Sequence, residues 1–396
     1  MLVPTPRLLP RTVIVLGCVS LLNDAASEMI TPLLPVFLTA TLGAGPAIVG
    51  LVEGVAEATA SIVKLLAGWL ADRGVGAKRL VLAGYGLANL TRPLIGVATL
   101  WPLVLALRFT DRIGKGIRTA PRDALIAGAT DAAARGRAFG FHRTMDHAGA
   151  MIGPLLAYLL LARQVPLGHV FLASVVPGML VLLLVGFGVP ADANAGPRPA
   201  PAPLRLSLLD ARLKALLAAA AVLALATVPE VFVVLWAREA GLAVAWVPLV
   251  WAGASLVKML LAYPAGIATD RFGRIPLLLC GWSARVCALA ALAFVPAHGA
   301  LVWLLFFGYS ASLVLTEPAE RSLIGDAAPP GVRGTAFGLY HLAAGLFMLP
   351  GAVLFGLIWQ HAGSAAAFAS AAAVTAVAAV GMALIARDAR RADKSC

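Results

Sequence analysis

Long apolar stretches recur along almost the whole chain, and they constrain the fold more than any other feature. A helix that crosses the hydrocarbon core of a bilayer needs about 20 predominantly apolar residues. Only 13% of the 396 residues are charged, whereas about a quarter are charged in an ordinary soluble domain. This composition excludes a soluble enzyme, a disordered chain and a secreted disulfide scaffold. The sequence predicts an all-α membrane protein with twelve transmembrane helices, at 12–41, 46–70, 79–98, 101–119, 136–162, 167–189, 212–237, 245–268, 275–295, 299–324, 333–359 and 365–387.

Basic residues are unevenly divided between the loops that join these stretches. One set of alternate loops carries most of them, including Arg79, Arg122 and Arg274, while the other set holds little beyond Arg163 and Arg238. Basic loops stay on the cytoplasmic side of a membrane. We therefore expect a multi-pass protein of the bacterial inner membrane with both termini in the cytoplasm. The net charge of +12 then reflects topology and attraction to anionic lipid, and not nucleic-acid binding.

The two halves of the chain resemble each other at an offset of 198 residues. Gly68-Trp-Leu-Ala-Asp-Arg aligns with Gly266-Ile-Ala-Thr-Asp-Arg, and Arg135-Gly-Arg-Ala-Phe-Gly aligns with Arg333-Gly-Thr-Ala-Phe-Gly. Six spans in each half give both halves the same orientation, as in a parallel repeat about an axis along the membrane normal. We expect two six-helix bundles related by pseudo-two-fold symmetry and joined by a Pro-rich cytoplasmic linker. The predicted division is an N-terminal bundle at 1–189, a linker at 190–211 and a C-terminal bundle at 212–396.

The loop after the second predicted span resembles a signature of the major facilitator superfamily. That signature, G-x-x-x-D-R-x-G-R-K, is matched here by Gly68, Asp72 and Arg73, and its second-half copy contains Asp270 and Arg271. The resemblance implies a secondary transporter whose two bundles rock against each other around a midplane site. We expect an ion pair at this membrane edge that breaks when the bundles part, and that therefore acts as a conformational latch. The alternative is a charge pair that only fixes topology.

Two motifs within the predicted helices extend the resemblance. Gly149, Gly153 and Pro154 are similar to the G-x-x-x-G-P element of the family's proton antiporters, and Arg112-Ile-Gly-Lys-Gly116 resembles an R-x-x-x-G element. Small residues let helices approach closely, and proline bends a helix. We expect Gly149, Gly153 and Pro154 to shape the packing of the fifth span.

Ionisable residues are concentrated in a few of the predicted spans, although each is costly to place in a bilayer. Asp24 and Glu28 share one helix face because they are four residues apart, and Glu53 and Glu57 repeat this spacing. The third predicted span holds a single charge, Arg92, and is expected to be outer scaffold. The remaining candidate residues are Arg108, Asp111, Arg112, Lys115, His142, Arg143 and Asp146 in the first half, and Glu230, Lys258, Glu317, Tyr340 and His341 in the second.

These residues predict a water-filled cavity in the first half, where acidic side chains face basic ones and change their protonation. Two carboxylates on one face disfavour joint ionisation, which makes one of them easier to protonate. A permanently paired network that holds the bundle together is the alternative. The second half is sparser in charge, and we expect it to supply apolar contacts to the solute.

We expect a proton-coupled secondary transporter that exports a small organic solute. No nucleotide-binding loop or nucleophile elbow occurs, so a gradient must drive transport, and neither enzymatic activity nor a cofactor is expected. The stripe of Arg108, Arg112 and Lys115 leaves open a uniporter or symporter for a small organic anion. A metal-ion transporter with His142 and Asp146 among its ligands is less favoured. The expected partners are a small-molecule substrate, protons and the lipid bilayer, without nucleic acid, and the chain is expected to be a monomer.

Overall fold

The computed structural model describes residues 9–72, 76–130, 135–189, 218, 221–327 and 333–392. Within these ranges the secondary structure is helical and contains no strand. Eight helical stretches of the described part are long and apolar enough to cross a membrane, and the last of them is broken at Gly363. The all-α membrane class is therefore confirmed, while the count of twelve spans and the two-bundle symmetry stay predictions. The eight are Pro46–Ala67, Ala77–Val97, Phe141–Ala162, Leu167–Gly188, Ala221–Glu239, Val244–Ala262, Arg274–Phe294 and Leu339–Ala383.

The fourth and tenth predicted spans differ from the helices of the structure, whereas the last two are separated by a break, as predicted. The fourth predicted span lies in α5 (Trp101–Gly128), which is helical but carries many charged residues. The tenth is apolar only over Ala300–Thr316, which is shorter than a full span. The last two predicted spans lie in one run, α14 (Arg333–Ala392), where Gly363 has a φ of 87°. Glycine adopts this left-handed conformation readily, so α14 consists of two helices that meet at Gly363.

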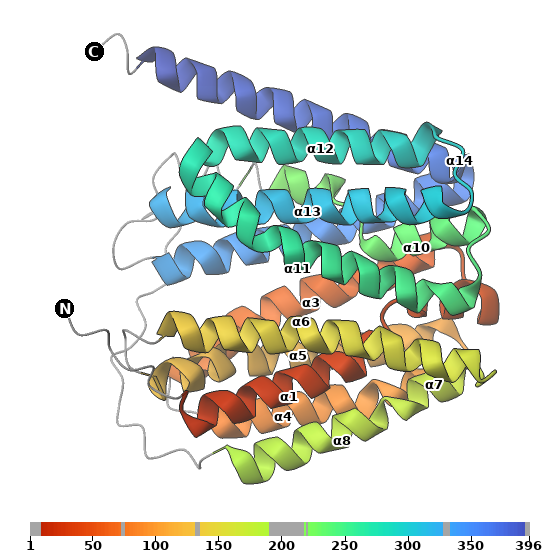
Figure 1. Cartoon of the computed structure of the whole chain (residues 1–396), viewed down its shortest axis with the longest axis vertical. Coiled ribbons are helices and arrows are strands. Elements are labelled where there is room, and N and C mark those ends of the chain that lie inside the picture. The colour runs from red at the N-terminus through yellow and green to blue at the C-terminus, as the bar shows by residue number, and fades with distance from the viewer. Residues whose placement is uncertain are drawn as a thin grey trace. The chain divides into compact units, whose positions relative to one another are not determined.

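The first compact unit contains Met1–Thr31 and Ile62–Ala202. Its helices are α1 (Arg11–Glu28), α4 (Ala77–Thr91), η2 (Pro93–Val97), α5, α6 (Arg135–Ala162), α7 (Leu167–Ala173), α8 (Val175–Leu183) and η4 (Leu184–Gly188). α1 packs along α6 and α4 packs along α5, as Figure 1 shows, while α8 contacts both α1 and α4. The apolar core of the unit includes the fully buried Leu16, Tyr85 and Val181.

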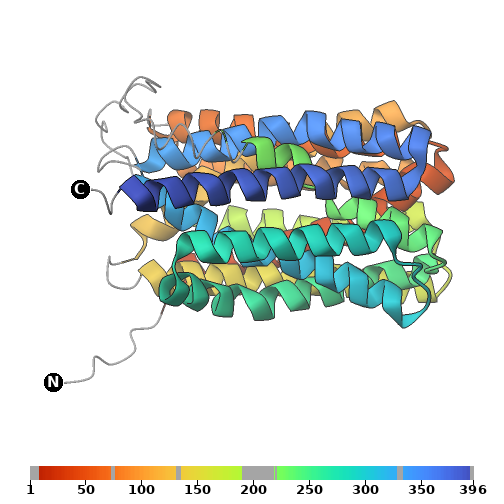
Figure 2. The ribbon, with the colours of Figure 1, turned by 90° about the horizontal axis from the view of Figure 1, so that it is seen from above.

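The second compact unit contains Pro32–Ser61 and Pro203–Cys396. Its helices are α2 (Leu34–Val36), η1 (Phe37–Thr41), the first part of α3 (Pro46–Asp72), α10 (Glu230–Glu239), η6 (Val244–Trp246), α11 (Val247–Phe272), α12 (Arg274–Phe294), α13 (Ala300–Ala327) and α14. α12 packs against α13 and α14, and Figures 1 and 2 both show α12 beside the C-terminal part of α14. The predicted linker at 190–211 lies outside the described residues, so the predicted domain division stays a prediction.

The first helical segment of each half is interrupted, at positions that match under the 198-residue repeat. α1 ends at Glu28 and residues 29–33 form turns, whereas residues 221–226 are helical and the helix resumes at Glu230 after 227–229. Pro32 and Pro229 lack the N–H that a continuous helix requires. The predicted uninterrupted spans at 12–41 and 212–237 are therefore broken in the structure. Consequently, an acidic residue lies at a helix end in each half: Glu28 at the end of α1 and Glu230 at the start of α10.

Candidate functional site

Two glycines of α6 bring its backbone close to α1. A Cβ atom at Gly149 would lie 3.0 Å from the Asp24 Cβ, and one at Gly153 would lie 3.0 Å from the Glu28 Cβ. Pro154 is buried directly after this pair. Side chains larger than glycine have no room at either position, so the two helices meet closely here. Asp24 and Glu28 therefore lie along the line of contact between α1 and α6.

A second carboxylate, Asp146, binds across the same helix pair. The Ser20 hydroxyl of α1 donates a hydrogen bond to Asp146 Oδ1. Asp146 Oδ2 lies 3.5 Å from His142 Nδ1 and 3.5 Å from Arg143 Nη1, both on α6. The His142 side chain is 3% exposed and that of Arg143 is 63% exposed. Sequence analysis missed Ser20, although its position four residues before Asp24 places it on the same face of α1.

Asp111 lies at the centre of a buried arginine cluster between α4 and α5. Arg92 donates to Asp111 Oδ1 from Nη2 at 2.7 Å and from Nε at 3.1 Å. Arg108 Nη1 and Arg112 Nε lie 3.6 and 3.7 Å from Asp111 Oδ2. The structure therefore brings together the predicted Arg108, Asp111 and Arg112, and adds Arg92. A lone arginine within an otherwise apolar span was the signal that could have identified Arg92, because such a charge needs a partner.

Two buried asparagines connect this cluster to Asp24. Arg92 Nη1 donates to Asn89 Oδ1 at 3.2 Å and to the Asn23 carbonyl at 3.4 Å. Asn89 Nδ2 donates to Asn23 Oδ1 at 3.4 Å, and Asn23 Nδ2 donates to Asp24 Oδ1 at 2.9 Å. Residues of α1, α4 and α5 thus share one continuous polar network inside the first unit.

Arg118 extends the predicted stripe of α5 by three residues beyond Lys115. Its guanidinium lies 4.5 Å from the centre of the buried Tyr85 ring, a distance at which a cation is attracted to an aromatic face. A Cβ atom at Gly114 would lie 2.6 Å from the Gly84 carbonyl oxygen. The resulting close approach of α4 and α5 places Arg118 over Tyr85. Sequence analysis missed Arg118, although the spacing of seven from Asp111 indicates a shared helix face.

The second unit contains an ion pair at the start of α10. Lys258 Nζ donates to Glu230 Oε2 at 2.7 Å, and the buried Ser310 hydroxyl donates to Glu230 Oε1 at 2.6 Å. The Tyr309 hydroxyl donates to the Val228 carbonyl at 2.5 Å, and thereby satisfies backbone in the helix break. Glu230 and Lys258 were both predicted site residues, whereas Tyr309 and Ser310 were missed. Tyr309 and Ser310 are uncharged residues within an apolar helix, so the sequence does not distinguish them from residues that only fill the core.

The other predicted site residues are more scattered. Tyr340 donates to Glu320 Oε2 at 2.7 Å and its ring centre lies 5.2 Å from that of His341. Glu53 and Glu57 lie on the part of α3 that belongs to the second unit. Arg271 is exposed beside Phe272. Arg73 lies outside the described residues, as do the surroundings of Gly68 and the side chains of Asp72, Asp270 and Glu317.

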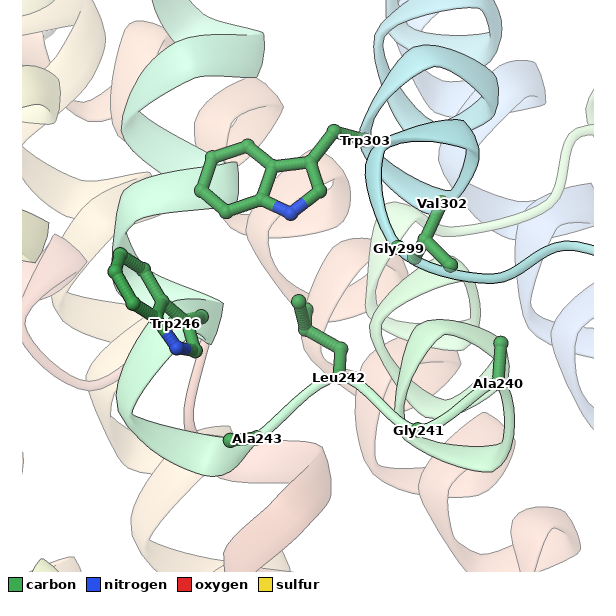
Figure 3. A pocket seen from close by; sticks show the side chains of 8 residues that line it. All are labelled: Ala240, Gly241, Leu242, Ala243, Trp246, Gly299, Val302 and Trp303. Carbon is green, nitrogen blue, oxygen red and sulfur yellow. The ribbon is translucent and has the colours of Figure 1, made fainter.

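A pocket of about 440 Å³ opens in the second unit between the loop before α11 and the start of α13 (Figure 3). The Trp246 and Trp303 rings meet edge to face there, with centres 6.2 Å apart. None of the residues that line this pocket is a predicted charged site residue. In the described part of the chain, no three His, Cys, Asp or Glu side chains gather closely enough to hold a metal ion.

Comparisons with known proteins place the chain among transporters. The family model of the Major Facilitator Superfamily matches residues 16–257. An uncharacterized MFS-type transporter of Methanocaldococcus jannaschii is 29% identical over 361 residues, which cover 89% of this chain and 90% of that relative. An uncharacterized protein of Mycobacterium tuberculosis is 41% identical over 153 residues, which cover 38% of this chain and 37% of that protein.

Solved transporter structures share the fold over nearly the whole chain. A bacterial homolog of the human lysosomal transporter Spinster has a TM-score of 0.77 at 15% identity, covering 95% of this chain and 96% of the other. The nucleoside transporter NupG has a TM-score of 0.80 at 13% identity, covering 94% and 99%. At such identities the similarity shows the fold alone. The predicted resemblance to the superfamily is confirmed by the family match, and the chain belongs to the major facilitator superfamily of multi-pass membrane transporters.

Proposed function

We propose that this protein is a proton-coupled secondary transporter that exports a small organic solute by alternating access. The observation that carries the proposal is the contact line between α1 and α6, where Asp24 and Asp146 come from adjacent helices in a closely packed setting. Asp24 accepts a hydrogen bond from the neutral Asn23 amide and Asp146 accepts one from the neutral Ser20 hydroxyl, while Asp146 also lies 3.5 Å from the exposed Arg143. A neutral donor favours the ionised carboxylate less strongly than the buried arginines around Asp111 do, so Asp24 and Asp146 can bind a proton more readily than Asp111.

Protonation at this position has a structural consequence. Asp146 accepts the Ser20 hydroxyl bond from α1 while it lies near His142 and Arg143 of α6. A proton bound to Asp146 weakens its attraction to Arg143 and changes the hydrogen bond that crosses the helix pair. A proton can therefore bias how α1 sits against α6, which is the kind of differential contact that a conformational switch needs.

The direction of transport is proposed on motif evidence. Gly149, Gly153 and Pro154 resemble an element of the family's proton antiporters, and their glycines carry the α1–α6 contact. We therefore favour export in exchange for protons. The latch of Asp72, Arg73, Asp270 and Arg271 belongs to the same proposal, as does the cytoplasmic location of both termini.

A pH-gradient-driven flux assay in proteoliposomes tests the proposal. Candidate solutes come from a thermal-shift panel of drugs, organic acids and metal ions on the purified protein at two pH values, because a bound ligand stabilises the native state. Asp24→Asn and Asp146→Asn are expected to abolish the response of flux to the pH gradient while solute binding persists. Unchanged flux with an unchanged pH dependence in both variants contradicts proton coupling through these residues.

A second candidate is a uniporter or symporter for a small organic anion. The cluster around Asp111 contains Arg92, Arg108 and Arg112, so it carries more positive than negative charge in the interior of the first unit. Buried positive charge of this kind suits a carboxylate or phosphate ligand. This function predicts stabilisation by organic anions in the same panel and loss of uptake on Arg108→Gln. Stabilisation by cationic or neutral solutes alone would favour the proton-coupled exporter.

A further inference from the structure

The hydrogen bonds from Arg92 to Asp24 form a chain in which every donor and acceptor is determined. A guanidinium group can only donate, so the Asn89 atom that faces Arg92 must be the amide oxygen. The Asn89 amide nitrogen then faces Asn23 and donates to its oxygen. The Asn23 amide nitrogen is left to face Asp24, where it donates to Oδ1 at 2.9 Å. The charge of Arg92 thus fixes the orientation of both asparagine amides.

The chain is anchored and enclosed at each step. Arg92 is held by its two bonds to Asp111, and both side chains are buried. Asn89 also donates to the Tyr85 carbonyl at 3.0 Å, and a Cβ atom at Gly178 would lie 3.0 Å from the Asn89 Cβ. Asn23 and Asn89 are 1% and 3% exposed. Buried amides with satisfied partners do not turn over without losing hydrogen bonds.

We infer that Arg92 and Asn89 are positioning residues for Asp24, because together they hold the Asn23 amide as a donor to its carboxylate. This inference rests on the proposed function of Asp24 as a proton site. The charged or titratable groups that surround Asp24 are Asp146 and His142 of α6 and Lys115 and Arg118 of α5, with Glu28 on its own helix. The chain of hydrogen bonds from Arg92 through Asn89 and Asn23 to Asp24, here called the relay, acts in addition to these charges, because the Asn23 amide is a neutral donor to the Asp24 carboxylate.

The relay makes a specific difference to proton binding. A hydrogen bond donated to a carboxylate favours the ionised form over the protonated one. Without the Asn89 amide, the Asn23 amide loses the contact that sets its orientation, and the bond to Asp24 weakens. The protonated form of Asp24 is then favoured relative to wild type, so its protonation midpoint moves to higher pH.

The test follows the carbonyl stretch of protonated carboxyl groups by infrared spectroscopy, using the full chain in lipid vesicles over a pH series. This measurement needs no transported solute. Asp24→Asn identifies the part of the signal that belongs to Asp24. Asn89→Leu keeps the side-chain volume and the Arg92–Asp111 ion pair, and is expected to move the Asp24 midpoint up by about one pH unit. Arg92→Lys keeps the positive charge beside Asp111 but loses the planar guanidinium group that donates to both Asp111 and Asn89. This variant is also expected to move the Asp24 midpoint to higher pH.

Thr91→Val is the matched control. The Thr91 hydroxyl lies on α4 between Asn89 and Arg92 in the chain, but it donates to the Leu87 carbonyl of its own helix. This variant is expected to leave the Asp24 midpoint unchanged. A midpoint that neither Asn89→Leu nor Arg92→Lys moves overturns the relay and leaves the proton site standing. The absence of any signal that Asp24→Asn removes overturns the proposed function and the relay together.

Discussion

Arg92 and Asp111 form a buried ion pair in which one carboxylate oxygen accepts two hydrogen bonds, at 2.7 and 3.1 Å, from one guanidinium group. The pair joins the end of α4 to the middle of α5, and both side chains are at most 3% exposed. A buried ion pair is strongly destabilised when one partner is removed, because the other charge is left in a medium that solvates it poorly. The packing of α4 against α5 in the first unit therefore depends on Arg92, which was not among the predicted site residues.

Arg92→Met is expected to destabilise the protein by about 3–5 kcal/mol, since Asp111 keeps its charge but loses its closest partner. Arg143→Met is the control, because the Arg143 side chain is 63% exposed and exposed ion pairs contribute at most about 1 kcal/mol. Thermal unfolding of the purified variants in detergent measures both effects. Equal melting temperatures for the two variants would show that burial does not determine how much the Arg92–Asp111 pair contributes to the free energy of unfolding.

Gly149→Ala is expected to destabilise the contact between α1 and α6. The new Cβ would lie 3.0 Å from the Asp24 Cβ and closer still to the Leu21 carbonyl oxygen, so the helices must separate. Overpacking of this kind costs about 1–3 kcal/mol. The matched control is Gly86→Ala on α4, where the nearest atom would lie 4.0 Å away. Removing a helical glycine there should stabilise by about 0.5–1 kcal/mol, so opposite shifts in melting temperature are expected.

The Ser20 hydroxyl bond to Asp146 should stabilise the contact between α1 and α6. Ser20→Ala is expected to cost about 1.5–3 kcal/mol near neutral pH, because the lost bond ends on a charged group. Ser174→Ala serves as the control, since its buried hydroxyl donates to the Phe171 carbonyl of its own segment. A loss for Ser20→Ala no larger than that for Ser174→Ala would argue against a bond that ends on a charged carboxylate.

Glu230 and Lys258 should show energetic coupling in a double-mutant cycle. Their charged atoms lie 2.7 Å apart, with side chains 15% and 24% exposed. The losses of stability of Glu230→Gln and Lys258→Met are expected to add up to more than the loss of the double variant. The difference, which is the coupling energy, should be about 0.5–3 kcal/mol. Unfolding of the two single variants and the double variant measures it. Additive losses would mean that the pair contributes no more than its separate contacts.

The elements of this protein follow from sequence to a large extent. Apolar runs of about 20 residues predict helices, and the helical spacing of Arg108, Asp111 and Arg112 predicts that they share a face of α5. The motif around Gly149 and Gly153 identified the family together with the loop signature. Interruptions near Pro32 and Pro229 were not predicted, because a proline within an apolar run does not by itself show whether a helix bends or ends.

The sequence by itself determined which segments are helical and which faces of these helices carry charge, because these properties repeat with the period of a single helix. It also determined which transporter family the chain resembles, because the motifs that carry the resemblance are short runs of neighbouring residues. Only the tertiary structure decided that Arg92 binds Asp111, that Asn89 and Asn23 connect this pair to Asp24, and that Ser20 binds Asp146. Those partners lie on different helices. Their pairing depends on which glycines let two backbones approach, and no periodicity within one segment contains that information.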